Sequence, residues 1–101
     1  MSHYFMKLIP KRPTFSQDMT PEERKTMLEH VAYWTDLQSK GFVHVFGPVL
    51  DPGGAWGMGV IEAETEAQVQ DFKNNDPVIK AGTHTMKIYS MKAVIKSNTT
   101  Q

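Results

Sequence analysis

The chain has 101 residues, enough for one domain and too few for two cores of ordinary size. Eleven lysines and arginines balance eleven aspartates and glutamates, so the formal net charge is zero. A neutral chain has no electrostatic preference for phosphate backbones or anionic lipids, and we therefore expect no nucleic acid and no membrane as partner. Cysteine is absent, which excludes a disulfide framework, a thiolate zinc site, an iron–sulfur cluster and a cysteine nucleophile.

The sequence contains no pattern typical of a targeting or membrane-spanning segment. The first nine residues lack a basic stretch followed by a long apolar run, and no stretch approaches the roughly 18 apolar residues that cross a bilayer. We therefore expect a cytoplasmic protein. We also expect residues 1–96 to form a single domain and residues 97–101, all of them polar, to form a flexible tail.

The first part of the chain predicts a strand, a loop and a long helix. Residues 4–9 are apolar apart from one lysine and are followed by a proline, which predicts a strand that ends there. Residues 10–19 predict a loop. Thr20 begins a helix with a capping-box pattern, and apolar residues then recur every three or four positions until Gly41, which ends the helix.

The rest of the chain predicts three strands and a second helix. These elements are a strand over 42–46, its hairpin partner over 57–63, a helix beginning at Thr65, a short helical turn at Asp76-Pro77 and a last strand over 83–95. In the first of these strands, we expect Phe42, His44 and Phe46 to share one face. The Gly47-Pro48 pair is expected to end that strand, because proline cannot donate to a ladder.

The resulting order, β-α-β-β-α-β, is that of the ferredoxin-like α+β fold, a four-stranded antiparallel sheet with two helices on one face. Two helices leave the other face of the sheet uncovered. The strands carry more large apolar side chains than two helices can cover, namely Phe5, Phe42, Phe46, Met58, Val60, Met86 and Ile88. An open apolar face marks an interface or a pocket, and we expect a homodimer packed sheet to sheet through it.

Without cysteine, the candidate reactive groups are histidines, carboxylates and hydroxyls. His30 lies at the edge of the apolar stripe of the long helix. From the residues alone this position favours a boundary histidine that only packs, and it also suits a general acid or base. Asp76, directly before a proline, has the position of a helix N-cap, and its second oxygen can also orient a histidine. The spacing of the two residues does not show whether they meet.

Two further patterns leave alternatives open. The glycine-rich stretch 47–57 matches neither a dinucleotide fingerprint nor a phosphate-binding loop, and is either an ordinary hairpin loop or, with Trp56, the rim of a pocket. His3, His44 and His84 fall on predicted strands at spacings that match no compact metal motif. We therefore expect no metal site, and no motif indicates another cofactor.

Three motifs follow one another along the chain in a familiar order. They are His30-Val31-Ala32-Tyr33-Trp34 leading to Gly41, Phe46 to Asp51 followed by Gly53 and Gly57, and Asn75-Asp76-Pro77-Val78-Ile79 leading to Ala81-Gly82. Together they resemble the YCII-related (YciI-like) family over about residues 4–95. The resemblance implies a ferredoxin-like fold assembled into a dimeric α/β barrel, with a site built on His30 and Asp76. Many members carry an arginine one turn before this histidine, where this chain has Met27.

The family resemblance also suggests a class of chemistry. One relative is similar to a dehydrochlorinase acting on a hydroxylated aromatic, and muconolactone isomerases share the wider superfamily. We therefore expect a cofactor-independent enzyme of proton-transfer type, a lyase, isomerase or hydrolase acting on a small aromatic or lactone-like metabolite. His30 would be the general acid/base and Asp76 would hold its tautomer. The residues expected to line the substrate pocket are Gly47, Pro48, Trp56 and Gly57.

Two other hypotheses use the same cleft. The first is a non-catalytic dimer that binds a small ligand without chemistry. The second is cofactorless oxygenation, as in other dimeric α/β-barrel proteins. Turnover of a bound compound would separate the enzyme from the binding protein, and oxygen consumption would identify the oxygenase.

Overall fold

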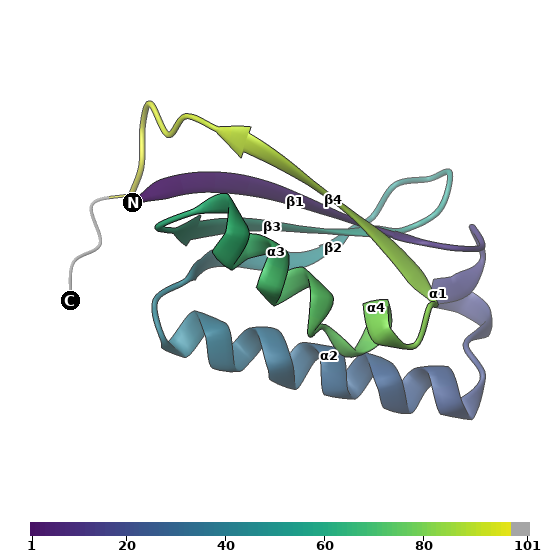
Figure 1. Cartoon of the computed structure of the whole chain (residues 1–101). Helices are drawn as coiled ribbons and strands as arrows, with labels where there is room; N and C mark the ends of the chain where they lie inside the picture. Colours follow the sequence, from purple (N-terminus) through teal and green to yellow (C-terminus); the bar gives the residue numbers. More distant parts are fainter. Residues whose placement is uncertain (98–101) are drawn as a thin grey trace.

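The elements follow the predicted order, with short helices beside the two long ones. The computed structural model describes residues 1–97. Its elements are β1 (Ser2–Pro10), α1 (Phe15–Asp18), α2 (Pro21–Ser39), β2 (Val43–Val49), β3 (Trp56–Ala63), α3 (Glu66–Asn74), α4 (Pro77–Lys80) and β4 (His84–Met91). Figure 1 shows their course along the chain. The ferredoxin-like α+β fold predicted from the sequence is confirmed.

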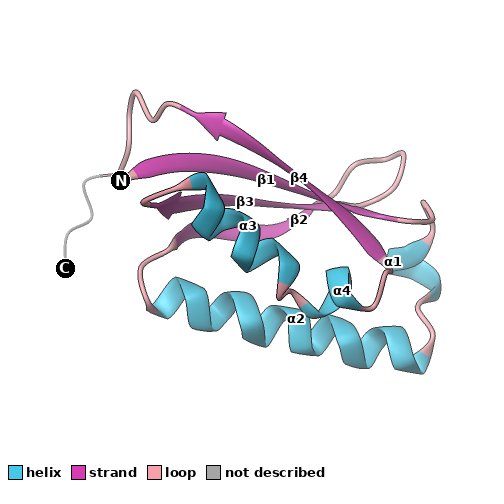
Figure 2. Ribbon diagram, viewed as in Figure 1, coloured by secondary structure: helices cyan, strands magenta, loops and turns pink. Residues whose placement is uncertain are grey.

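The four strands form one antiparallel sheet in the order β2-β3-β1-β4. All the helices lie on one face of this sheet and leave the other face open, as Figure 2 shows. Because successive side chains of a strand point to opposite faces, the register assigns each residue to a face. Tyr4, Met6 and Leu8 of β1 are buried beneath the helices, and the alternate residues Phe5 and Lys7 lie on the open face.

The hydrophobic core fills the layer between the sheet and the helices. Its buried members are Tyr4, Met6, Leu8, Trp34, Leu37, Val43, Ile61, Ala63, Val69, Val78 and Met86. The Trp34 ring, only 1% exposed, lies 5.9 Å from the ring of Phe46 and 6.4 Å from that of Phe72. Trp34 thus joins helix α2 to both the sheet and α3, and the apolar area that it buries stabilises the fold by about 25 cal/mol per Å².

The start of α2 is stabilised by the predicted capping box and is tied to α1. Thr20 Oγ1 accepts from the amide of Glu23, and the Glu23 carboxylate accepts from the amide of Thr20. Arg12 donates to Glu23 at 2.7 and 2.8 Å and to Asp18 at 2.9 Å. The bonds from Arg12, with that from the Thr20 amide, lower the pKa of Glu23 to about 2. Gly41 follows the helix at a φ of 91°, a conformation that favours glycine.

The segment predicted as a loop, residues 10–19, contains helix α1. Phe15 at its start is 4% exposed and packs edge-on against the ring of His84, with 4.7 Å between ring centroids. A single helical turn is too short to show an apolar period in the sequence. The loop prediction is therefore wrong over Phe15–Asp18, where the chain forms a helical turn that buries Phe15.

Strand β2 does not end at Gly47-Pro48, as predicted, but continues to Val49. This strand lies at the edge of the sheet, where a proline nitrogen that faces away from the neighbouring strand costs no ladder hydrogen bond. At the other edge, β4 ends at Met91 instead of continuing to Ile95, which is 93% exposed.

A β-bulge around His44 changes the faces expected for strand β2. Phe42 and Phe46 both pack against aromatic residues on the helix side. His44 lies on the open face, where its ring stacks on His3 with 5.4 Å between centroids and its Nε2 is 2.6 Å from Glu62. The prediction that Phe42, His44 and Phe46 share one face is wrong, because the bulge interrupts the two-residue alternation.

The open face carries fewer of the expected apolar side chains than predicted. Phe5, Met58 and Val60 lie there by their register. Four others face the helices instead, namely Phe42, Phe46, Met86 and Ile88. Met86 pairs across the strands with the buried Leu8, which explains its position. Val45 and Tyr89, 54% and 48% exposed, add apolar area to the open face.

No helix within residues 1–97 is long and apolar enough to span a membrane. The polar tail expected over residues 97–101 falls outside the described part of the chain, except for its first residue. The expected domain over residues 1–96 contains every helix and strand described above.

Replacing Thr20 by alanine should destabilise the protein by about 1 kcal/mol, because the amide of Glu23 loses its capping acceptor. Urea denaturation of wild type and Thr20→Ala measures this change. Thr35→Ala is the control for loss of a threonine hydroxyl from the same helix, since Thr35 donates to the carbonyl of Val31 and does not cap the helix start. Equal losses in both variants would contradict a specific contribution from the cap.

Candidate active site

His30 and Asp76 meet between helices α2 and α4, although 46 residues separate them in the sequence. His30 Nδ1 lies 2.8 Å from one carboxylate oxygen of Asp76 and 3.0 Å from the other. His30 is 2% exposed and Asp76 is completely buried. The structure therefore brings together the two residues that the sequence offered as an acid/base and its orienting carboxylate.

The Asp76 carboxylate is surrounded by hydrogen-bond donors. Besides His30, it accepts from the indole Nε1 of Trp34 at 2.7 Å and from the backbone amide of Val78 at 3.1 Å. An ionised carboxylate is an acceptor only, so this set of donors matches a buried anion. The Val78 bond is the N-cap bond of α4, which means that Asp76 caps a helix and holds a histidine at the same time.

This arrangement determines which nitrogen of His30 carries the proton. Because Asp76 only accepts, the neutral imidazole carries its proton on Nδ1 and presents a lone pair at Nε2. Within residues 1–97, Nε2 of His30 has no hydrogen-bond partner, and the His30 ring lies against a cavity. An oriented imidazole with one nitrogen left unpaired can take up or release a proton on a bound molecule.

Local structure explains how these side chains reach one another. Trp34 follows His30 by four positions, so both project from the same face of α2 toward the sheet. Helix α3 ends at Asn74, and Pro77 occupies the first turn of α4, where its missing amide hydrogen is not needed. The short connection between α3 and α4 thereby directs Asp76 at the middle of α2.

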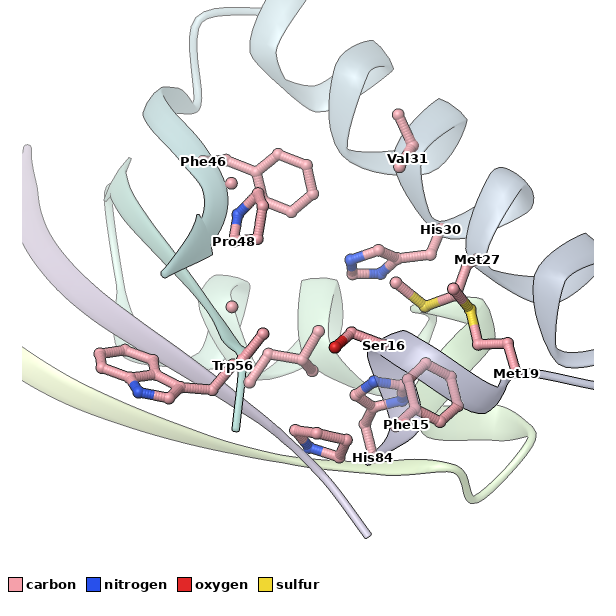
Figure 3. A pocket seen from close by; sticks show the side chains of 15 residues that line it. Phe15, Ser16, Met19, Met27, His30, Val31, Phe46, Pro48, Trp56 and His84 are labelled. Atoms are coloured by element: carbon pink, nitrogen blue, oxygen red, sulfur yellow. The ribbon is translucent and has the colours of Figure 1, made fainter. Parts of the chain in front are cut away.

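A cavity of about 260 Å³ lies between α2, α1 and one end of the sheet (Figure 3). Its lining residues are Leu8, Pro10, Phe15, Ser16, Met19, Met27, His30, Val31, Phe46, Gly47, Pro48, Ala55, Trp56, Gly57 and His84. Among residues 1–97 the lining is almost wholly apolar and holds no lysine, arginine or carboxylate. All four residues expected to line a pocket, Gly47, Pro48, Trp56 and Gly57, border the same cavity as His30.

Trp56 lies at the rim of the cavity. Its indole Nε1 donates to Asp51 at 3.1 Å, and the ammonium group of Lys7 lies 4.5 Å from the centre of its ring. Asp51 also accepts from the Gly53 amide at 2.8 Å, which folds the loop before β3 into a tight turn. The stretch that the sequence left open between an ordinary loop and a pocket rim contributes Gly47, Trp56 and the residues near it to the cavity wall.

Sequence reasoning missed several residues of the site. The helical period of α2 indicates only that Trp34 is a core residue, although its position one turn after His30 also suits a donor to the same partner. Phe15 lies in the segment predicted as a loop, where no pattern indicates burial. Phe46 lies 5.3 Å from the His30 ring, and His84 borders the cavity from β4. Only the pairing of distant segments reveals these last two.

His84 is a second histidine of the cavity wall with a different character. It is 6% exposed, and its Nδ1 lies 2.8 Å from Thr83 Oγ1. Burial, reinforced by the nearby His30, lowers the pKa of His84 to about 4. His84 therefore stays neutral near pH 7 and adds no charge to the cavity.

The position where many relatives of the resembled family carry arginine also borders the cavity. Met27 occupies it, one turn before His30, and brings an apolar side chain to the lining. Arg24, a further turn back, is exposed and does not line the cavity. The cavity is accordingly suited to a ligand that is neutral or carries its charge away from this wall.

The fold and the site define a ferredoxin-like α+β protein with a buried histidine–carboxylate pair beside an apolar cavity. The model of the YCII-related domain matches residues 4–92, and the chain therefore belongs to the YCII-related family. A similar solved structure is that of 5-chloro-2-hydroxyhydroquinone dehydrochlorinase (TftG) from Burkholderia phenoliruptrix AC1100 in complex with 2,5-dihydroxybenzoquinone. The two chains are 26% identical, the match covers 88% of this chain and 93% of that chain, and the TM-score is 0.67. The comparison with curated proteins finds no match.

The depressed pKa of His84 predicts a dependence of stability on pH. Histidine in an unfolded chain titrates near pH 6.5. Between about pH 6.5 and pH 4, His84 therefore binds a proton in the unfolded state and stays neutral in the folded state. The free energy of unfolding should fall with decreasing pH in this window, by up to about 1.4 kcal/mol per pH unit from this residue.

Urea denaturation between pH 4 and pH 7, on wild type and His84→Gln, measures this contribution. The variant should lose stability less steeply than wild type as the pH falls, because glutamine does not titrate. Contributions of the other titrating groups cancel in the difference between the two curves. Parallel curves would show that His84 accepts a proton in the folded state as readily as in the unfolded one.

Proposed function

We propose that this protein is a cofactor-independent enzyme of proton-transfer type, a lyase, isomerase or hydrolase that acts on a small aromatic or lactone-like metabolite. His30 is its general acid/base and Asp76 is the positioning residue behind it. The observation that carries the proposal is the hydrogen bond between His30 Nδ1 and the buried Asp76, which leaves Nε2 unpaired beside the cavity.

The chemistry of the cavity supports a compact and largely apolar substrate. Its volume of about 260 Å³ and its lining of methionine, phenylalanine, proline and leucine side chains suit a single substituted ring. The similar structure, TftG, is a dehydrochlorinase of a chlorinated hydroxyhydroquinone, in complex with a dihydroxybenzoquinone. The size and apolar lining of the cavity favour a single small ring, and the likeness to TftG favours a ring with hydroxyl or carbonyl substituents.

In the proposed reaction, a substrate hydroxyl or carbon acid lies against Nε2 of His30. The imidazole takes the proton, and the adjacent Asp76 carboxylate stabilises the resulting imidazolium. Trp34 and the Val78 amide hold the carboxylate in place, so the ring does not have to reorient during the transfer. The same proton then returns to another atom of the substrate or to the leaving group.

Substitution of His30 by glutamine should lower kcat by about 10²–10⁴-fold, since glutamine cannot transfer the proton. The substrate is sought first, by thermal-shift screening of hydroxylated quinones, chlorinated hydroquinones and unsaturated lactones, and turnover of each hit is then followed. Asp76→Asn should also slow turnover, because an amide does not stabilise the imidazolium. Leu28→Ala, on the outer side of α2, controls for general effects on the helix. Full activity in His30→Gln would disprove the assignment.

A non-catalytic ligand-binding protein is the alternative. The apolar lining favours it, because few of the lining side chains can transfer a proton. Within the described chain the titratable side chains of the lining are His30 and His84, and His84 stays neutral near pH 7. The two functions differ in what happens to a bound compound. An enzyme converts it with a pH profile governed by a histidine, whereas a binding protein releases it unchanged.

We also propose that a second copy of the chain covers the open face of the sheet. The side chains that support this are Phe5, Val45, Met58, Val60 and Tyr89, an apolar group on a face that no helix covers. The net charge of zero removes the repulsion that would keep two copies apart. Burying this group between two sheets would remove apolar area from water in both copies at once.

The proposed dimer predicts that Tyr89→Glu gives a monomer, because a carboxylate would be buried without a partner in the interface. Light scattering coupled to gel filtration measures the mass of the particle for both chains. Leu28→Glu is the matched control, since Leu28 is 69% exposed on the outer side of α2 and lies away from the sheet. A wild-type monomer at high protein concentration would contradict the proposal.

A further inference from the structure

Three potential metal ligands meet on the open face of the sheet, on the opposite side from the cavity. His3 of β1, Glu62 of β3 and His44 of β2 place one nitrogen or oxygen atom each within 4.8 Å of the others. His44 Nε2 lies 2.6 Å from Glu62 Oε1, and His3 Nε2 lies 3.6 Å from the same oxygen. We call these three residues the sheet-end cluster.

Backbone geometry brings the sheet-end cluster together. His3 and Glu62 are direct cross-strand partners in the antiparallel pair β1–β3, so their side chains stand side by side on one face. His44 reaches the same face through the β-bulge between Val43 and Val45, which redirects its side chain toward Glu62. Each of three neighbouring strands therefore supplies one ligand.

One atom of the cluster lacks a partner. Within residues 1–97, Nε2 of His3 is a buried side-chain nitrogen without any hydrogen bond. The side chains of His3 and Glu62 are only 12% and 19% exposed, so water has limited access to them. The His44–Glu62 bond alone would account for those two residues, but it leaves His3 unsatisfied at a free-energy cost of about 1–3 kcal/mol.

We propose that His3, His44 and Glu62 bind a divalent transition-metal ion such as Zn²⁺. Two imidazole nitrogens and one carboxylate oxygen are ligands that zinc prefers, and three protein ligands leave a fourth position for water. A bound ion would fill the gap beside His3 Nε2 and would replace a short His44–Glu62 contact by two metal bonds. Because zinc–nitrogen and zinc–oxygen bonds are about 2.0–2.2 Å long, the three ligand atoms would rearrange around the ion as it binds.

Sequence spacing does not reveal such a site, for a physical reason. Compact metal motifs place ligands a few positions apart, whereas these three lie at positions 3, 44 and 62. Only the strand pairing and the bulge bring them together. The site is also distinct from the His30–Asp76 pair, which lies beneath the helices on the other face of the sheet.

One neighbouring group opposes a cation. Lys96 Nζ lies 3.5 Å from Glu62 Oε1 and is 48% exposed. Because this ammonium group occupies the approach to the carboxylate, it competes with a metal ion and has to swing into solvent when the ion binds. Removing it should therefore strengthen metal binding, whereas removing a ligand should weaken it.

A metal ion here would join three strands at the end of the sheet where β1 begins. Figure 1 shows that the start of β1 and the ends of β3 and β4 lie at this same end of the sheet. The ion would cross-link β2, an edge strand, to the central strands, and it would stabilise the folded state in proportion to the logarithm of the metal concentration.

Isothermal titration of the untagged chain with Zn²⁺ tests the proposal. One ion should bind per chain, and both His44→Gln and Glu62→Gln should weaken binding by more than about tenfold, since each lacks a direct ligand. Lys96→Ala should bind zinc at least as tightly as wild type. Titration with Co²⁺ should produce visible absorption bands that disappear in His44→Gln.

His30→Gln is the control for binding at the other histidine site and should bind zinc like wild type. Circular dichroism and thermal unfolding verify that each variant is folded. The proposal is overturned if wild type binds no zinc, if binding survives in both His44→Gln and Glu62→Gln, or if His30→Gln removes it.

Discussion

The buried carboxylate of Asp76 is the interaction on which the rest of the site depends. A charge completely removed from water is tolerated only when hydrogen-bond donors surround it, because an unpaired one costs several kcal/mol. Its donors come from two places, the side chains of His30 and Trp34 on α2 and the backbone amide at the start of α4. The need to satisfy this group therefore holds α4 against α2 and sets the orientation of the imidazole.

The parts of the fold that could be predicted are those that depend on short-range patterns of residues in the sequence. The capping box at Thr20 and the three- and four-residue period after it mark α2 without reference to anything else in the chain. The helix pattern also puts His30 and Trp34 on one face. It does not show that Asp76 lies opposite them, because that contact spans 46 residues and depends on how α3 ends. For that pairing, only the family resemblance provided an expectation.

The predictions that failed concern features decided by neighbouring strands. Pro48 continues strand β2 because that strand is at the edge, and edge position is a property of strand order. His44 leaves the face expected from alternation because β2 and β3 pair with a bulge. Phe15 is buried because a single turn of helix, anchored by Arg12, packs beside the start of β4. None of these arrangements has a local signature in the sequence.

The apolar lining of the cavity has a consequence for discrimination between related compounds. A wall without charged side chains distinguishes molecules mainly by size and shape, and one methylene group changes binding by only about 1–3 kcal/mol in such surroundings. Rejection of an analogue that merely adds or lacks a ring substituent would be weak. A protein of this construction is expected to be promiscuous within a chemical series, and a change at a single wall position such as Met27 could redirect it to a new member of that series.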